Sequence, residues 1–198
     1  LTFNLIKLKN HRTMKKIFIL AFIATLGFTI TSCKDKNKEI PVATEAEKAV
    51  KVKVVMASKS GSNVTGNAVF TQEGDEVTMV AMIEGLEPGT HAIHLHEKAD
   101  CSSDDGTSSG GHWNPTAQPH GKWGDATGYH KGDIGNMEAD DKGRVVKYFT
   151  TNEWCIGCGD GNKDILGKAI IVHQGTDDFT SQPSGNAGSR ISCGGIIK

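Results

Sequence analysis

The segment Ala92-Ile93-His94-Leu95-His96-Glu97 predicts a β-strand that carries two histidines. Successive side chains of a strand point to opposite faces, so His94 and His96 leave the same face and can meet one metal ion. Such a pair also occurs without a metal, as a half-buried structural pair or as a chance surface pair. The rest of the chain therefore has to decide what this strand belongs to.

Other short strands are predicted on both sides of it. From Val50 to Met56 apolar residues recur at every second position, as in a strand with one face on a core. The turn Glu73-Gly74-Asp75 predicts a β-hairpin between strands at 64–71 and 76–83. Further candidate strands are 144–150, 168–174 and 190–197, and no stretch of ten residues or more forms a convincing amphipathic helix. Seven or eight short strands with Gly-rich excursions predict an all-β fold, a Greek-key antiparallel β-sandwich or flattened barrel with immunoglobulin-like architecture and long metal-binding loops.

The composition predicts one domain. A chain of 198 residues with 37% hydrophobic residues can bury one ordinary core. The 24 glycines suit a turn-rich protein whose loops carry much of its length. We place this domain at 49–198.

Residues 1–33 predict an export signal that lies outside the fold. Met14-Lys15-Lys16 is a short positive region, and 17–30 is an apolar run too short to span a membrane comfortably. Ile30-Thr31-Ser32-Cys33 resembles the lipobox of bacterial lipoproteins, which implies lipidation of Cys33 and a protein anchored in the bacterial cell envelope, facing the periplasm or the cell surface. An ordinary cleaved signal, with Cys33 incidental, is the alternative. The polar segment 34–48 is then a flexible tether.

Removal of this leader makes the chain acidic. It takes away five basic residues and no acidic ones, so that 17 basic residues remain against 23 acidic ones and the net charge is −6. A net-acidic chain without a basic stripe argues against nucleic acid as a partner.

Seven of the eight histidines lie between His91 and His173. With His173 on a second strand facing the same point, His94 and His96 would offer three imidazoles, which suit copper or zinc. The long loop between them offers a second set, His120, His130 and Asp133, which is compatible with tetrahedral zinc if one more nitrogen is found. His112 could be that nitrogen, and an imidazolate can bind a second metal through its other ring nitrogen. A loop of this length without secondary structure is explained by metal ligation.

At these residues the sequence resembles the copper-zinc superoxide dismutases, over essentially all of 49–198. The motifs that carry the resemblance occur in the family's order: Gly89-Thr90-His91-Ala92-Ile93-His94-Leu95-His96, Gly111-His112-Trp113-Asn114-Pro115, His130-Lys131-Gly132-Asp133 and Gly185-Asn186-Ala187-Gly188-Ser189-Arg190-Ile191-Ser192-Cys193-Gly194-Gly195. The sandwich architecture, electrostatic steering and near-diffusion-limited rate are general descriptions of this family.

The resemblance implies one copper and one zinc per subunit. Copper would be held by His94, His96, His112 and His173, and zinc by His112, His120, His130 and Asp133. Asp177 matches a carboxylate that joins the copper ligand His94 to the zinc ligand His120. The alternative is that Asp177 is an ordinary solvated acid of the loop. His91 matches a histidine that braces the sheet without binding metal.

The implied activity is dismutation of superoxide to oxygen and hydrogen peroxide by one-electron cycling of copper. His112 would carry a proton to the departing peroxide, and Arg190 would attract and orient the anion. The loop between His173 and Arg190 is shorter than in eukaryotic members and lacks lysine. Steering would therefore rest on Arg190, the metals or basic residues such as Lys122 and Lys131.

The five cysteines fit an oxidising compartment. Cys101 and Cys193 match the family's disulfide, which would close a loop of about 92 residues and contribute roughly 4 to 5 kcal/mol. Cys155 and Cys158 are expected to form a short local disulfide, with free thiols or an accessory metal as alternatives and a redox role as the lesser interpretation.

Two other functions are weighed against the dismutase. A non-catalytic copper-binding or delivery protein on the same fold should have lost ligands or the arginine, and here every expected position is filled. A zinc hydrolase would need an open zinc position. The expected partners are superoxide and, through the lipid anchor, a membrane, while a homodimer is compatible with the family.

Overall fold

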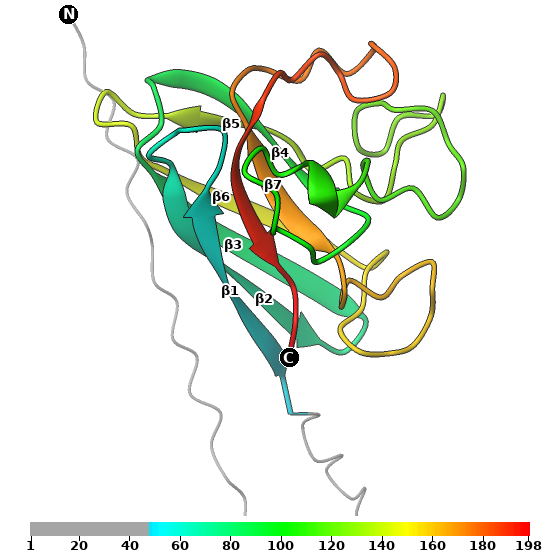
Figure 1. Ribbon diagram of the computed structural model, residues 1–198. Helices are drawn as coiled ribbons and strands as arrows, with labels where there is room; N and C mark the ends of the chain where they lie inside the picture. Colours follow the sequence, from blue (N-terminus) through cyan, green and yellow to red (C-terminus); the bar gives the residue numbers. More distant parts are fainter. Residues whose placement is uncertain (1–47) are drawn as a thin grey trace, which may run out of the picture. The chain divides into compact units, whose positions relative to one another are not determined.

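A computed structural model describes residues 48–198, which form eight strands (Figure 1). The predicted leader, its lipidation residue Cys33 and nearly all of the tether at 34–48 lie outside the described residues. The strands are β1 (Val50–Ser58), β2 (Thr65–Glu73), β3 (Glu76–Glu84), β4 (Gly89–His96), β5 (Gly135–Ala139), β6 (Val145–Thr151), β7 (Ala169–His173) and β8 (Arg190–Gly195).

All strand pairs are antiparallel, in the order β5-β4-β7-β8-β1-β2-β3-β6. The two end strands of this ladder come together, because Lys147 Nζ on β6 donates a hydrogen bond to the Asn136 carbonyl of β5 over 2.7 Å. The sheet is therefore a nearly closed, flattened barrel, and the predicted all-β antiparallel fold is confirmed.

The alternation seen in the sequence places the core. On β1 the side chains of Val52, Val54 and Met56 are buried while their neighbours are exposed. Strand β3 repeats the pattern, with four alternate apolar residues buried from Val77 to Ile83. Both faces of β4 are buried, because one face lies on the core and the other lies beneath the long loops.

The hairpin prediction is also confirmed. Strand β2 ends at Glu73, β3 begins at Glu76, and these two residues pair across a two-residue turn in which Gly74 has a φ of 57°. One strand was not predicted, β5, whose five residues contain a glycine and no β-branched residue.

Helix is almost absent from the described residues. The one helical element there is the 3-10 turn Thr107–Ser109, which lies in the long loop after β4. Within 48–198 no helix has the length and apolar character needed to cross a bilayer.

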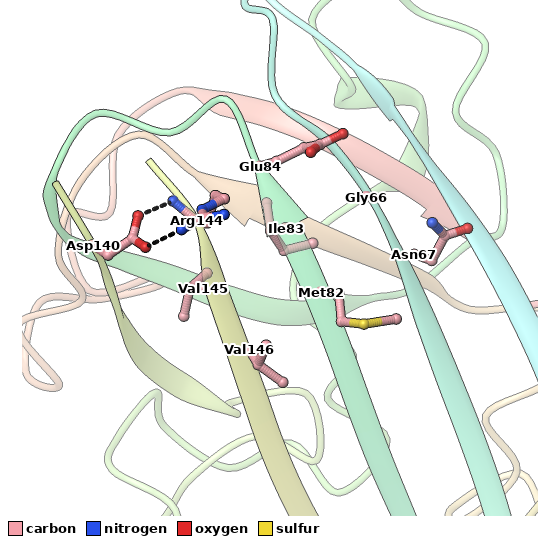
Figure 2. A pocket seen from close by; sticks show the side chains of 9 residues that line it. All are labelled: Gly66, Asn67, Met82, Ile83, Glu84, Asp140, Arg144, Val145 and Val146. Atoms are coloured by element: carbon pink, nitrogen blue, oxygen red, sulfur yellow. Dashed lines mark hydrogen bonds and ion pairs between the residues drawn. The ribbon is translucent and has the colours of Figure 1, made fainter. Parts of the chain in front are cut away.

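A hollow of about 560 Å³ lies over the outer face of β2, β3 and β6 (Figure 2). Met82 and Val146 are half exposed in its lining. Its charged residues include Asp140 and Arg144, which pair with each other at 3.1 Å. No histidine or cysteine lines it, so the metal-type chemistry of this chain lies elsewhere.

Candidate metal centre

The structure gathers the predicted ligands into two buried groups that share one residue. In each group the candidate ligand atoms all lie within 4.8 Å of one another. The four-histidine cluster consists of His94, His96, His112 and His173. The aspartate cluster consists of His112, His120, His130 and Asp133.

Strands β4 and β7 supply most of the four-histidine cluster. His94 and His96 lie on the face of β4 that turns away from the core residues Ile93 and Leu95. His173 is the last residue of β7, which pairs directly with β4. His112 comes from the loop and is brought in by a backbone bridge to His96.

A second contact fixes each of the three strand-borne rings. One ring nitrogen of His96 lies 2.9 Å from the Gly110 carbonyl, and one of His173 lies 3.3 Å from the Gly188 carbonyl. His94 Nε2 lies 2.9 Å from a carboxylate oxygen of Asp177. The remaining nitrogens then point inward, with the Nε2 atoms of His96 and His173 only 3.3 Å apart. Anchoring of the outer nitrogen is what orients a histidine for metal binding.

The aspartate cluster is organised around one carboxylate. Asp133 is fully buried and lies 2.8 Å from His112 Nδ1, 3.0 Å from His120 Nδ1 and 3.2 Å from His130 Nδ1. It also accepts hydrogen bonds from the backbone N–H groups of Gly121 and His130. Three imidazoles and one carboxylate form a set that suits tetrahedral zinc.

Four buried ring nitrogens lack a hydrogen bond in this arrangement. They are His94 Nδ1, His112 Nε2, His120 Nδ1 and His130 Nδ1. The last two approach Asp133 without the alignment of a hydrogen bond. Buried polar atoms without a partner are costly, and these four all belong to the two clusters. The donor set therefore fits two metal ions of the copper or zinc type.

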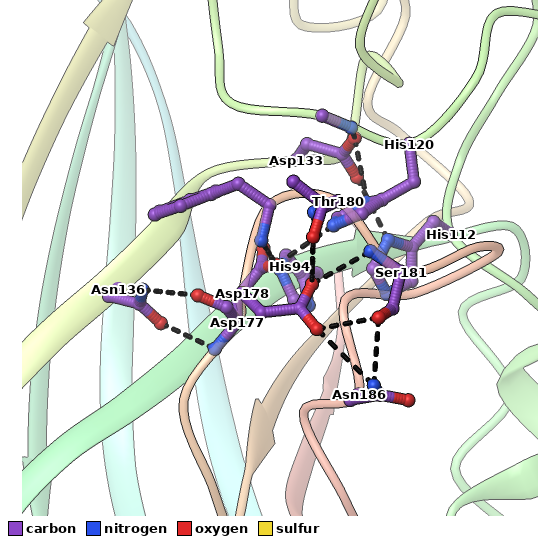
Figure 3. Close-up of polar contacts among 12 residues, drawn as sticks. His94, His112, His120, Asp133, Asn136, Asp177, Asp178, Thr180, Ser181 and Asn186 are labelled. Atoms are coloured by element: carbon purple, nitrogen blue, oxygen red, sulfur yellow. Dashed lines mark hydrogen bonds and ion pairs between the residues drawn. The ribbon is translucent and has the colours of Figure 1, made fainter.

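Asp177 joins the two clusters. Its two carboxylate oxygens lie 2.9 Å from His94 Nε2 and 2.8 Å from His120 Nε2. Asn136 on β5 holds its backbone from both sides, donating to the Asp177 carbonyl and accepting from the Asp177 N–H, each over 2.8 Å (Figure 3). Asp177 is almost fully buried, which excludes the solvated loop acid considered above.

The loop that carries Asp177 is bound to the loop that carries His120. The Gln182 side chain accepts a hydrogen bond from the His120 N–H over 2.8 Å and donates to the His120 carbonyl over 2.9 Å. Gly185 has a φ of 66°, and a Cβ there would overlap the Asp177 carboxylate and lie 2.7 Å from His120 Nε2. Only glycine suits this position.

Burial and the Asp133 carboxylate give the histidines of the two clusters different pKa values. Burial lowers the pKa of His96 and of His173 well below the ordinary value. It also lowers the pKa of His112 to about 4, against the opposing hydrogen bond to Asp133. For His120 burial acts in the same direction, but the adjacent carboxylates of Asp133 and Asp177 outweigh it and raise the pKa to about 9. The four-histidine cluster thus contains neutral nitrogen donors, and the aspartate cluster contains compensated charge.

Arg190 lies at the opening of the four-histidine cluster. It shares a hollow of about 350 Å³ with His96, His112 and His173, among other residues. Its Nη1 donates to the Gly106 carbonyl over 2.9 Å and to Ser109 Oγ over 3.1 Å, which fixes the guanidinium.

The two lysines considered for steering do not line this hollow. Lys131 is paired with Glu153, which also accepts a hydrogen bond from the Tyr129 hydroxyl over 2.6 Å. Trp154 Nε1 donates to the Lys131 carbonyl over 2.8 Å. These contacts attach the segment around His130 to the loop after β6.

The other predicted residues are placed as follows. Both ring nitrogens of His91 face backbone carbonyls, those of His173 and Glu87, so this ring is used in holding the sheet. The predicted disulfide between Cys101 and Cys193 is confirmed, and the structure also joins Cys155 to Cys158. The supporting residues Asn136, Gln182, Gly185, Glu153 and Trp154 were not predicted as part of the site.

Two comparisons with known proteins bear on these clusters. The family model described as copper/zinc superoxide dismutase matches residues 64–196. The crystal structure of a double mutant of a SOD-like protein from Bacillus subtilis is similar, with 32% sequence identity and a TM-score of 0.66. That match covers 74% of this chain and 97% of the other one.

Proposed function

Since this chain belongs to the copper/zinc superoxide dismutase family, we propose that it converts superoxide to oxygen and hydrogen peroxide. We propose copper for the four-histidine cluster and zinc for the aspartate cluster. Copper would supply the one-electron chemistry of both half-reactions, and zinc would hold the site together.

One observation carries the proposal. Three members of the four-histidine cluster, His96, His112 and His173, line the hollow that also contains Arg190. The aspartate cluster reaches the hollow only through His130 and the shared His112, and its Asp133 carboxylate is fully buried. A redox ion needs access for a small anion, and a structural ion does not. The two clusters differ in this respect.

His112 would serve as the proton carrier. Its Nδ1 is held by Asp133 at 2.8 Å, and its Nε2 points into the four-histidine cluster without a hydrogen bond. A proton taken up at Nε2 in one half-reaction is available there for the departing peroxide in the next. Because Asp133 holds the ring of His112, Nε2 stays directed into the four-histidine cluster.

Arg190 would bind and orient superoxide. Burial lowers the pKa of Arg190, but a guanidinium stays protonated in proteins. Two of its hydrogen bonds go to Gly106 and Ser109, so the positive charge is held in place before the anion arrives. No lysine lines the hollow, so steering depends chiefly on this arginine and on the metals.

A non-catalytic copper protein is the second candidate, because the similar crystal structure is of a protein described as SOD-like. In that double mutant a tyrosine and a proline were each replaced by histidine. Here every predicted ligand position is filled and Arg190 is in place, which favours catalysis. A zinc hydrolase is disfavoured because every donor of the aspartate cluster surrounds one point, leaving no open position.

Superoxide consumption by the copper- and zinc-loaded protein tests the proposal. The native protein should turn over rapidly, and the Arg190→Ala variant should lose roughly 10- to 100-fold while keeping both metals. Val146→Ala, on the outer face of β6, should act like the native protein. Tight binding of copper without turnover would instead support the second candidate.

We also propose export and lipid anchoring through Cys33. The two disulfides of the described residues support an oxidising compartment. Incorporation of a labelled fatty acid into the expressed protein should be lost in Cys33→Ser. Equal labelling of both proteins would refute the anchor.

A further inference from the structure

The two disulfides differ in how far solvent reaches them. Cys193 is 1% exposed and packs with Ala169 and Ile171, and its partner Cys101 is partly buried against the same cluster. Cys155 is also buried, with 6% exposure, but its partner Cys158 is exposed on the loop between β6 and β7. One sulfur of the second pair can therefore be attacked by an external thiol in the folded protein.

A carboxylate shapes the loop around Cys158. Asp164 accepts hydrogen bonds from the N–H groups of Gly157 and Gly159, each over 2.9 Å, and from that of Leu166 over 3.0 Å. These bonds hold the residues on both sides of Cys158 without using the sulfur. They also account for Asp164, which lies close enough to the two sulfurs to resemble a third metal ligand.

The backbone of Cys155 is held just as firmly. Its N–H donates to the Lys163 carbonyl over 2.8 Å, and its carbonyl accepts from the Ile165 N–H over 3.0 Å. The positions of the two sulfurs therefore do not depend on the bond between them. If that bond is broken, the thiols stay close together and can close again.

The surroundings of Cys158 differ from those of Cys155. The N–H of Asp160 points at Cys158 Sγ over 3.5 Å, and a donor of this kind stabilises a sulfur anion. Cys155, by contrast, lies next to the buried Trp154 and Ile156. Because Cys158 is exposed and Cys155 is buried, the first attack is expected at Cys158, with Cys155 as the leaving sulfur. The Asp160 N–H then stabilises the Cys158 thiolate when the second step releases it.

We propose that Cys155 and Cys158 form a second redox site that exchanges electrons with an external dithiol. A thiolate of that dithiol attacks Cys158 Sγ, forms a mixed disulfide and expels Cys155 as a thiolate, which takes a proton. The second thiol of the dithiol then attacks the first sulfur of the same molecule, which is bonded to Cys158 in the mixed disulfide. This step releases Cys158, which takes the other proton. Two electrons pass to the protein, and the external dithiol becomes a disulfide.

A merely structural crosslink is the competing explanation. A disulfide stabilises mainly by closing a long loop, and this one spans only three positions in the sequence. The loop is already held by hydrogen bonds that do not involve sulfur. The crosslink therefore adds little to the fold, whereas the exposed sulfur allows exchange.

Equilibration with dithiothreitol buffers of graded potential, followed by alkylation and peptide mass analysis, tests this inference. Cys155–Cys158 should open in the folded protein at potentials that leave Cys101–Cys193 intact, so Cys101–Cys193 is an internal control. Circular dichroism should stay native through this step. Opening of both pairs together, or opening of Cys155–Cys158 only as the protein unfolds, would overturn the proposal.

Two single variants test the direction of attack. Cys155→Ser leaves the exposed Cys158 thiol, and Cys158→Ser leaves the buried Cys155 thiol. With an aromatic disulfide reagent the first variant should react at least about tenfold faster than the second. Equal rates, or a faster Cys155, would contradict the assignment of Cys158 as the attacked sulfur. Both variants should bind metals as the native protein does, since neither sulfur touches the clusters.

Discussion

The two clusters share His112 but are built in opposite ways. Three members of the four-histidine cluster lie on the paired strands β4 and β7, so their positions are set by a hydrogen-bonded ladder. The members of the aspartate cluster lie on the loop between β4 and β5, and their positions are set by the Asp133 carboxylate. The four-histidine cluster is positioned mainly by strands of the barrel, and the aspartate cluster is positioned by contacts within a loop.

The difference in charge follows the difference in construction. Burial leaves His96 and His173 with pKa values well below the ordinary one, so these donors are neutral. In the aspartate cluster burial would raise the pKa of Asp133, but the three adjacent histidine rings and the His130 N–H hold it far below the ordinary value. A rigid, neutral and accessible set suits an ion that changes its charge, and a closed, compensated set suits an ion that does not.

Removal of a strand-borne ligand should have the largest effect. His96→Ala takes away a buried nitrogen at the opening of the four-histidine cluster, and activity should fall by several orders of magnitude, to the level of the copper-free protein. The measurement is superoxide consumption after reloading with both metals. Val146→Ala, on the outer face of β6, is the control. Substantial activity in His96→Ala would show that this cluster is not the reaction site.

Neutralising the central carboxylate should come next. Asp133→Asn removes the buried negative charge and replaces one of the two acceptor oxygens by an NH2 donor that faces histidine rings and backbone N–H groups, and it should destabilise the protein by about 3–5 kcal/mol. Urea unfolding of the metal-free protein measures this effect, with the exposed Asp141→Asn as control. If the two variants unfolded alike, the aspartate cluster would not be organised by its carboxylate.

The bridge between the clusters should have an intermediate effect on both metals. Asp177→Asn loses the contacts that orient His94 and His120, and the affinity for each ion should fall by about 10- to 100-fold. Competition with a chelator measures both affinities. Asp178→Asn is the matched control, since its carboxylate binds only groups of its own loop, such as Ser181 and Asn186 (Figure 3). A loss of one metal alone would show that Asp177 serves one cluster.

The attachment of the loop to the barrel should have the smallest effect, and it should depend on pH. Burial would raise the pKa of Glu153, but its bonds to Lys131 and Tyr129 lower it below the ordinary value of 4.5. The folded state thus favours the carboxylate, and its contribution of about 1 kcal/mol or less is present above pH 4.5 and is lost as the pH falls through the folded pKa. Native protein and Glu153→Gln should differ in unfolding free energy at pH 7 and converge in acid. A difference that persists in acid would point to another cause.

Much of the fold follows from local sequence pattern. Period-two alternation marks β1 and β3 because one face of each is buried and the other is exposed. Strand β5 escaped prediction because its five residues owe their strand form to pairing with β4 rather than to propensity.

The ligands were also predictable, whereas their supports were not. A histidine two residues from another on a strand has a local signature, and the family motifs supply the rest. Asn136 and Gln182 have none, because each holds a backbone 41 or 62 residues away in the chain. Pairings of this kind exist only once the loops are folded against one another.

Metal analysis of two variants tests the central claim most directly. After equilibration with copper and zinc and removal of excess metal, the native protein should hold one of each. His173→Ala should lose copper and keep zinc, while His130→Ala should lose zinc and keep most of its copper. Of the two variants, only His130→Ala should show the electron paramagnetic resonance signal of Cu(II) in nitrogen ligands. Parallel loss of both metals in both variants would contradict the account of two differently built sites.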